Sequence, residues 1–226
     1  DLHSFPTRRS SDLNAAYPTY GDLRDHVPAF AQVAGVRATT MNLGRGADAT
    51  QIRVAAVSHQ YFPMLGVSPS LGRLFGPDED RAGGERVAVL SAGFWQHRFG
   101  GDSGVLGRRV ELGSGGYTIV GIGPTGFGGL DLAPVDLFVP IAASVGDVLG
   151  DASALNSRGW IWLSVIARLK PGMTREQAAS QATLAYRRGA VSQQRGDSTA
   201  QVLLGPIQAA RGPTASSDAK VSAWIG

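Results

Sequence analysis

The sequence predicts an α+β fold in which helices pack on mostly antiparallel strands. Apolar segments of strand length recur along the 226 residues and are separated by turns rich in glycine, of which the chain has 31. Between these segments lie a few stretches with helical spacing or a helix-capping pattern. A hydrophobic fraction of 43% is enough for a packed core and excludes a chain that is disordered as a whole.

The first segments predict a helix followed by a hairpin. Between residues 17 and 34, apolar residues at spacings of three and four predict a short helix that is interrupted near Pro28. The segments 33–43 and 51–57 alternate loosely in polarity and predict two strands. The stretch 44–48 contains two glycines and would join these strands as a hairpin turn.

A second short helix is expected after the hairpin. Ser58 could cap it and Gly66 would end it. The aromatic and apolar residues of this helix could be read as a ligand-binding box, but side chains at helical spacing are more typical of a core; they are Tyr61, Phe62, Met64 and Leu65. Residues 68–85 are rich in proline, glycine and acids and predict a loop, and 87–90 predict a buried strand.

A capped helix and a second hairpin follow. Ser91 is expected to cap a helix that Gly100 ends, with its aromatic residues at core spacing: Phe94, Trp95 and Phe99. The segments 109–112 and 117–122 predict strands around the turn 113–116, which has three glycines.

The rest of the chain is expected to add three strands and a helix. A glycine-rich loop at 123–129 precedes a short strand at 137–140, and the residues 160–169 give the strongest strand pattern of the chain. A last strand is expected at 201–204.

The last expected helix opens with a capping box, Thr174 to Gln177, after the turn Pro171-Gly172. Its alanines at 178, 182 and 185 form a small-residue face that allows close packing.

Composition excludes several classes of protein. The absence of cysteine excludes a disulfide framework, a thiolate zinc site and a cysteine nucleophile. The net charge is +3 and the basic residues are almost all scattered arginines, so we expect no nucleic-acid partner. The sequence contains no run of about 18 uncharged apolar residues, so we expect no membrane-spanning segment in it. No secretory signal is visible either.

The first thirteen residues, DLHSFPTRRSSDL, show no core pattern and resemble a translated sequencing adapter. We therefore leave 1–13 out of the fold, as an artefactual or disordered tail. This interpretation predicts that the chain is a fragment and that its gene continues upstream.

No motif predicts catalytic, cofactor-binding or metal-binding residues, and we expect no cofactor. Gly121 to Gly126 match G-x-G-x-x-G, but no helix pattern follows, so a tight glycine turn is favoured over a dinucleotide site. The acidic trio 78–80 lacks further metal ligands at a set spacing. The four histidines show no zinc spacing; they are His3, His26, His59 and His97. A hydrolase that uses Ser58 or the carboxylates of the acidic loop is a further hypothesis.

The order of short motifs along the chain resembles the periplasmic core domain of MacB-type ABC transporter permeases, and it is especially similar to large permeases of acidobacteria and related bacteria. The resemblance covers residues 14–226. In chain order the motifs are Val57-Ser58, Tyr61-Phe62, Leu65-Gly66, Gly72-Arg73, Val87 to Ser91, Phe94-Trp95, Arg98 to Asp102, Gly107-Arg108, Tyr117 to Gly121, Pro124, Gly126-Phe127, Leu137 to Pro140, Arg168 to Gly172 and Gln177-Ala178.

The resemblance implies a domain with a porter-like α/β lobe and a smaller β-rich lobe, outside the cytoplasmic membrane between two transmembrane helices. We expect the core domain at 14–210 and a linker at 211–226 that leads to an absent transmembrane helix, with Trp224 as an interfacial anchor.

The resemblance also implies a function. In the family this domain does no chemistry and relays motion driven by ATP hydrolysis, which takes place in a separate ATPase subunit. The implied partners are that ATPase, reached through the missing membrane part, a periplasmic adaptor, and a second permease copy; substrate contact is also open. The alternative is a free-standing soluble periplasmic binding module.

Overall fold

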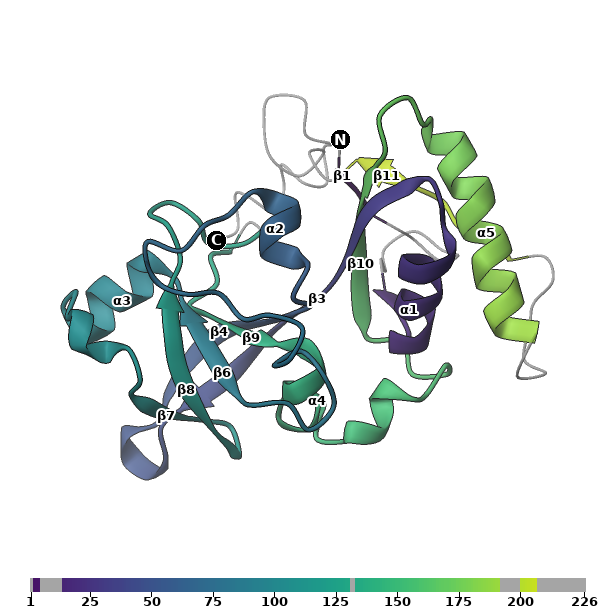
Figure 1. Cartoon of the computed structure of the whole chain (residues 1–226). Coiled ribbons are helices and arrows are strands. Elements are labelled where there is room, and N and C mark those ends of the chain that lie inside the picture. Colours follow the sequence, from purple (N-terminus) through teal and green to yellow (C-terminus); the bar gives the residue numbers. More distant parts are fainter. Residues whose placement is uncertain (1, 5–13, 131–132, 192–199, 207–226) are drawn as a thin grey trace. The chain divides into compact units, whose positions relative to one another are not determined.

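The chain folds into two compact units (Figure 1). The computed structural model describes residues 2–4, 14–130, 133–191 and 200–206. The first unit is built from both ends of the chain, 1–34 and 156–226, and the second from the contiguous middle, 35–155. Each unit combines strands with helices, so the predicted α+β class is confirmed. No helix in the described ranges is both long and apolar enough to cross a membrane.

The first unit is a small sheet with two helices. Strand β10 is central: it pairs with β3 on one side and, antiparallel, with β1 and β2 on the other, while β11 extends the sheet beyond β1. Helices α1 and α5 pack against each other in Figure 1. The elements are β1 (Leu2–Ser4), β2 (Asn14–Ala15), α1 (Tyr17–His26), the start of β3 (Phe30–Leu43), β10 (Leu163–Leu169), α5 (Arg175–Val191) and β11 (Gly205–Pro206).

Helix α5 begins as its sequence predicts. The Thr174 amide donates to the Gln177 side chain at 3.0 Å, and the Gln177 amide donates to the Thr174 hydroxyl at 3.2 Å, which is a reciprocal capping box. The alanines at 178, 182 and 185 are all buried. Their small side chains leave room for the chain packed against them, as expected.

An ion pair within the first unit lies at the contact between α1 and α5. The Arg158 guanidinium forms a bidentate pair with the Asp22 carboxylate of α1, with Nη2 at 3.2 Å from Oδ1. Gly189 of α5 is buried beside this pair, and a Cβ atom there would overlap both the carboxylate and the guanidinium. The missing side chain therefore allows the two helices to approach.

The second unit is rich in strands. Its elements are the rest of β3, β4 (Thr50–Val57), α2 (Tyr61–Leu65), β5 (Leu71–Gly72), β6 (Val87–Leu90), α3 (Ala92–Phe99), β7 (Arg109–Leu112), β8 (Gly115–Ile122), β9 (Leu137–Pro140) and α4 (Ile141–Leu149). Single turns of 3₁₀ helix lie at 46–48, 103–105 and 152–155.

Six of these strands close into a barrel, in the order β3-β4-β9-β6-β8-β7 and back to β3. The last pairing joins Leu43 to Leu112, and two backbone bonds of 2.9 Å flank it, from Gly44 N to the Glu111 carbonyl and from Gly113 N to the Asn42 carbonyl. The pairs β4–β9 and β6–β8 are parallel and the others antiparallel. Closure leaves few open strand edges in this unit.

An aromatic cluster fills part of the core of this unit. Phe62 meets Phe138 edge to face at a centroid distance of 5.3 Å, and Phe127 stacks on Phe138 at 5.6 Å. Tyr61 and Phe62 of α2 are almost fully buried. Tyr61, Phe62 and Met64 thus belong to the core, the interpretation that the sequence favoured over a ligand box, whereas Leu65 is half-buried.

The predicted helix caps had different outcomes. Ser91 caps α3 as predicted, because its hydroxyl accepts from the Phe94 amide at 3.3 Å, and Gly100 ends that helix in a left-handed conformation. Gly66 ends α2 in the same way. The prediction that Ser58 caps α2 is wrong: its hydroxyl accepts instead from the Gly35 amide at 3.1 Å, which ties β3 to the end of β4.

The structure differs from the predicted elements at three other places. Helix α4 was not predicted at all. The strand expected at 160–169 begins only at Leu163, and Trp160 and Ile161 lie exposed before it. The strand expected at 201–204 is reduced to one isolated bridge at Val202, and a short strand follows at 205–206 instead.

The chain termini bear on the expected domain limits. Leu2–Ser4, within the stretch left out of the fold, pairs with β10, because an extended backbone can hydrogen-bond to a strand whatever its side chains are. That residues 1–13 are adapter-derived stays a prediction. The linker 211–226 and Trp224 lie outside the described residues.

Candidate functional site

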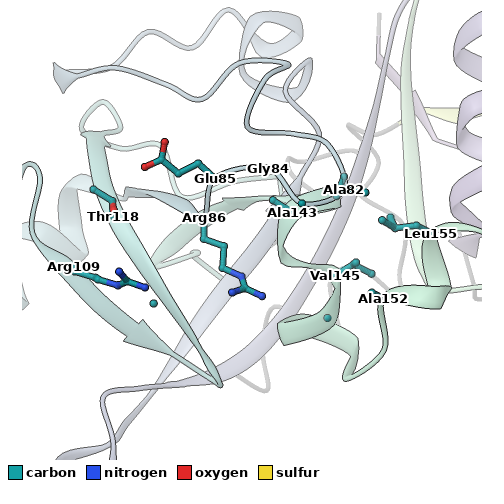
Figure 2. Close-up of a pocket in the computed structure, with 14 residues that line it drawn as sticks. Ala82, Gly84, Glu85, Arg86, Arg109, Thr118, Ala143, Val145, Ala152 and Leu155 are labelled. Atoms are coloured by element: carbon teal, nitrogen blue, oxygen red, sulfur yellow. The ribbon is translucent and has the colours of Figure 1, made fainter.

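The candidate functional site is a cavity of about 460 Å³ in the second unit (Figure 2). The segment 82–86 lies on one side of it, and β7 and β8 contribute Arg109, Gly116 and Thr118. Helix α4 and the turn at 152–155 supply an apolar wall. A second hollow lies elsewhere on this unit, at Arg98, Phe99 and Arg108, where the Arg108 guanidinium covers the Phe99 ring.

The β7–β8 hairpin places Arg109 at the cavity. Arg109 and Thr118 are directly paired across the two antiparallel strands, so their side chains share one face. The Arg109 guanidinium lies across Gly116, where a Cβ atom would overlap it. Because Gly116 has no side chain, the long Arg109 side chain can lie directly on the backbone of β8.

A buried carboxylate anchors the second arginine of the cavity. The Asp147 side chain is only 4% exposed and accepts hydrogen bonds from the Tyr117 hydroxyl and the Ser114 hydroxyl, both at 2.7 Å. Arg86 Nε lies 2.9 Å from the same carboxylate. The carboxylate thus receives three donors, and its charge is matched by Arg86.

Tyr117 acts in this group as a permanent donor. Burial raises the pKa of the Tyr117 hydroxyl well above its usual range, and the neighbouring Asp147 carboxylate raises it further because a second negative charge would be repelled. The hydroxyl therefore stays protonated and keeps its bond to Asp147.

Ser58 and His59 are adjacent in sequence but serve different structural bonds. Ser58 is fully buried. The His59 ring Nδ1 lies 3.2 Å from Asp80 Oδ2, and the Asp80 carboxylate also accepts from the amides of His59 and Ala142. Asp80 thereby ties the loop before β6 to the end of β4 and to the start of α4. Among the side chains that the structure describes, Ser58 and a histidine ring do not come together as a nucleophile and its base.

The acidic trio 78–80 also diverges in space. Glu79 pairs with Arg73 at 2.6 Å and accepts from the Gly76 amide at 2.8 Å, whereas Asp80 points to His59 and Asp78 is exposed. His26 and His97 are both exposed, and the side chain of His3 lies outside the described residues. Among the side chains that the structure describes, no group of His, Asp and Glu could hold a metal ion.

The glycine motif at 121–126 serves backbone packing. Gly121 pairs with Gly72 of β5, and a Cβ atom on either residue would overlap the opposite backbone. No helix opens after β8, and the chain continues as a loop in which Gly126 has a φ of 82°. The arrangement lacks the helix N-terminus that a dinucleotide site needs.

The sequence pattern did not predict the cavity, because it did not predict helix α4, which forms one wall. A signal was present: Ile141, Val145 and Leu149 recur every four residues between Pro140 and Gly150, and Gly150 ends the helix with a φ of 79°. Arg86 and Arg109, in contrast, are distant in sequence, and nothing local pairs them.

Comparison with known proteins gives a consistent result. The family model of the MacB-like periplasmic core domain matches residues 2–185. No curated protein sequence matches the chain. The extracellular domain of the noncanonic ABC-type transporter YknZ from Gram-positive bacteria is 14% identical, with a TM-score of 0.67 over 91% of this chain and 100% of that one. The periplasmic region of MacB from Actinobacillus actinomycetemcomitans is 13% identical, with a TM-score of 0.66 over 92% of this chain and 89% of that one.

Proposed function

Because the chain belongs to the family of MacB-like periplasmic core domains, we propose that it relays ATP-driven motion for an ABC transporter permease and performs no chemistry of its own. Membership of the family makes the chain an extracytoplasmic domain of a MacB-like permease. We propose that its role in export is a mechanical relay.

The division into two compact units is the observation that carries the relay. The chain passes between the units twice, within β3 and after residue 155. Compact bodies joined by few chain crossings can move as rigid parts, with the change absorbed at the crossings. Such a body transmits a displacement that begins at a distant ATPase.

The partners follow from the same proposal. ATP would be hydrolysed by a separate ATPase subunit that reaches this domain through the membrane part of the permease. A periplasmic adaptor and a second permease copy are further proposed partners. Within the described residues, the buried Ser58 and the divergent acidic trio support a role without catalysis.

The relay is tested by measuring distances in the intact permease with its ATPase, reconstituted in a membrane. The domain has no cysteine, so introduced cysteines can be spin-labelled without competition from native ones here. One pair, His97→Cys with Leu184→Cys, reports between units; both positions are exposed. The control pair, His97→Cys with Ala47→Cys, lies within the second unit.

We expect the distance distribution of the first pair to differ between the nucleotide-free and ATP-trapped transporter, while the control pair keeps its distribution. If the first pair stays unchanged although ATP is hydrolysed and substrate is moved, the relay is wrong. A change in both pairs would contradict rigid-body motion.

The cavity in the second unit favours one alternative, a free-standing periplasmic binding module. A permease domain and a free-standing module predict different sequences on either side of this chain in the gene. Sequencing across both ends of this chain in its source DNA should reveal apolar segments of about 20 residues on each side if it is part of a permease. A reading frame that closes on both sides without them would support the module.

A further inference from the structure

We propose that the cavity of the second unit binds a small organic anion, with its oxyanion group held by Arg86 and Arg109 and its apolar body lying on α4. The proposed relay assigns no ligand to this domain, so the inference goes beyond it and does not depend on it.

Arg109 is the first reason to expect an anion. Its side chain has no hydrogen bond or ion pair among the described residues, although it lines the cavity. Its guanidinium lies against Gly116 on one side, and the residue is exposed, so its charge is not matched by a carboxylate. A guanidinium presents a planar set of donors that fits carboxylate or phosphate oxygens.

Arg86 is the second reason. Its Nε is engaged by the buried Asp147, which holds the side chain in one orientation and leaves the terminal Nη groups as donors. Asp147 is itself satisfied by Tyr117 and Ser114, so it does not compete for Arg109. In Figure 2 the Glu85 carboxylate points away from both guanidinium groups. The cavity therefore offers the unpaired guanidinium of Arg109 and the terminal donors of Arg86, whose charge Asp147 already matches.

The apolar wall of the cavity indicates the chemistry of the rest of the ligand. It consists of apolar side chains from α4 and the following turn: Ala142, Ala143, Val145, Ala152 and Leu155. A volume of about 460 Å³ lies in the range of cavities that hold small molecules. An oxyanion on a short apolar body uses both walls, whereas a bare inorganic ion would leave the apolar one uncovered.

The test is an NMR titration of the folded chain with three probes: hexanoate, 1-hexanol and inorganic phosphate. We expect saturable hexanoate binding that shifts the amide signals of Arg109, Thr118 and Ala143, and much weaker binding of the neutral alcohol. Phosphate serves to identify the oxyanion: tighter binding than hexanoate would assign the site to phosphate-bearing ligands and tighter hexanoate binding to carboxylates, and either result supports an anion site.

Arg109→Gln should weaken binding of the preferred anion by about tenfold or more, because it removes a charge-assisted contact. Arg98→Gln is the matched control, since it removes the same charge from an arginine that does not line this cavity, and it should leave the affinity unchanged. If Arg109→Gln fails to fold, Ala143→Glu places a carboxylate on the apolar wall and should also weaken anion binding.

Three results would overturn the proposal: no saturable binding of either anion, equal binding of hexanoate and 1-hexanol, or equal losses in Arg109→Gln and Arg98→Gln. None of these results affects the distances measured by spin labels. Failure of this inference and failure of the relay are therefore distinguishable.

Discussion

Tyr117 links the stability of the barrel to pH. Its raised pKa means that the folded protein keeps the phenol proton under conditions in which the unfolded chain releases it. Its contribution to the free energy of unfolding is therefore complete below the ordinary tyrosine pKa of about 10 and declines above it, by up to about 1.4 kcal/mol per pH unit.

We predict that Tyr117→Phe is less stable than the parent protein at about pH 8, by about 1–2 kcal/mol, because Asp147 loses a donor. The difference should narrow towards about pH 11, since only the parent loses stability through this residue. Urea unfolding of the variant and the parent at both pH values measures this difference in the free energy of unfolding. Ser114→Ala removes a donor to Asp147 but no titrating phenol, so its difference in free energy of unfolding from the parent should not depend on pH. If the difference for Tyr117→Phe is equally constant, Tyr117 does not link stability to pH.

Residue roles could be predicted where a bond is local and not where its partner is distant. The capping bonds of Ser91 and of Thr174 with Gln177 span three residues, so the sequence alone places them. Ser58 also precedes a helix, but its hydroxyl bonds to Gly35, which pairs with it only once β3 and β4 are aligned. The same limit hid the bond of Asp80 to Ala142, 62 residues away.

At the scale of elements, the packing of α1 on α5 depends on one glycine. We predict that Gly189→Ala lowers the free energy of unfolding by about 1–3 kcal/mol, because its methyl group must displace the Asp22–Arg158 pair. Alanine is otherwise preferred over glycine in helices by about 1 kcal/mol. Gly21→Ala in α1, where a Cβ atom meets nothing within 4 Å, should therefore raise stability by about 0.5–1 kcal/mol.

Urea unfolding of the two variants separates the effects. Opposite signs support the close approach at Gly189. If both substitutions stabilise the protein, helix propensity dominates and the approach carries no cost.

Most elements could be read from the sequence because their signals are local: turns with glycine, caps, and alternation in the hairpin β3–β4, whose predicted strands pair in the structure. Pairings between distant strands could not. The parallel pairs β4–β9 and β6–β8 bring together segments far apart in the chain, and no residue pattern within a strand names its partner. Barrel closure through Leu43 and Leu112 is of the same kind.

At the scale of the whole molecule, the two units differ in how they are encoded. The second is one continuous segment, 35–155, whereas the first needs both ends of the chain. All six barrel pairings and the buried aromatic cluster lie within the continuous segment. A closed barrel with its own core has what a segment needs to fold without its neighbour.

We therefore predict that residues 35–155, expressed alone, unfold in urea in one cooperative transition and retain near-UV circular dichroism. Trp95 is the only tryptophan in this segment and reports the change, because its ring nitrogen donates to the Asp102 carbonyl at 2.9 Å. Leu112→Ala at the closing strand pair, where the side chain is buried, should cost about 2–4 kcal/mol. A gradual transition without near-UV signal would mean that the barrel needs the other unit to form. The two units would then be one cooperative body, and the rigid-part motion on which the relay rests would lose its structural basis.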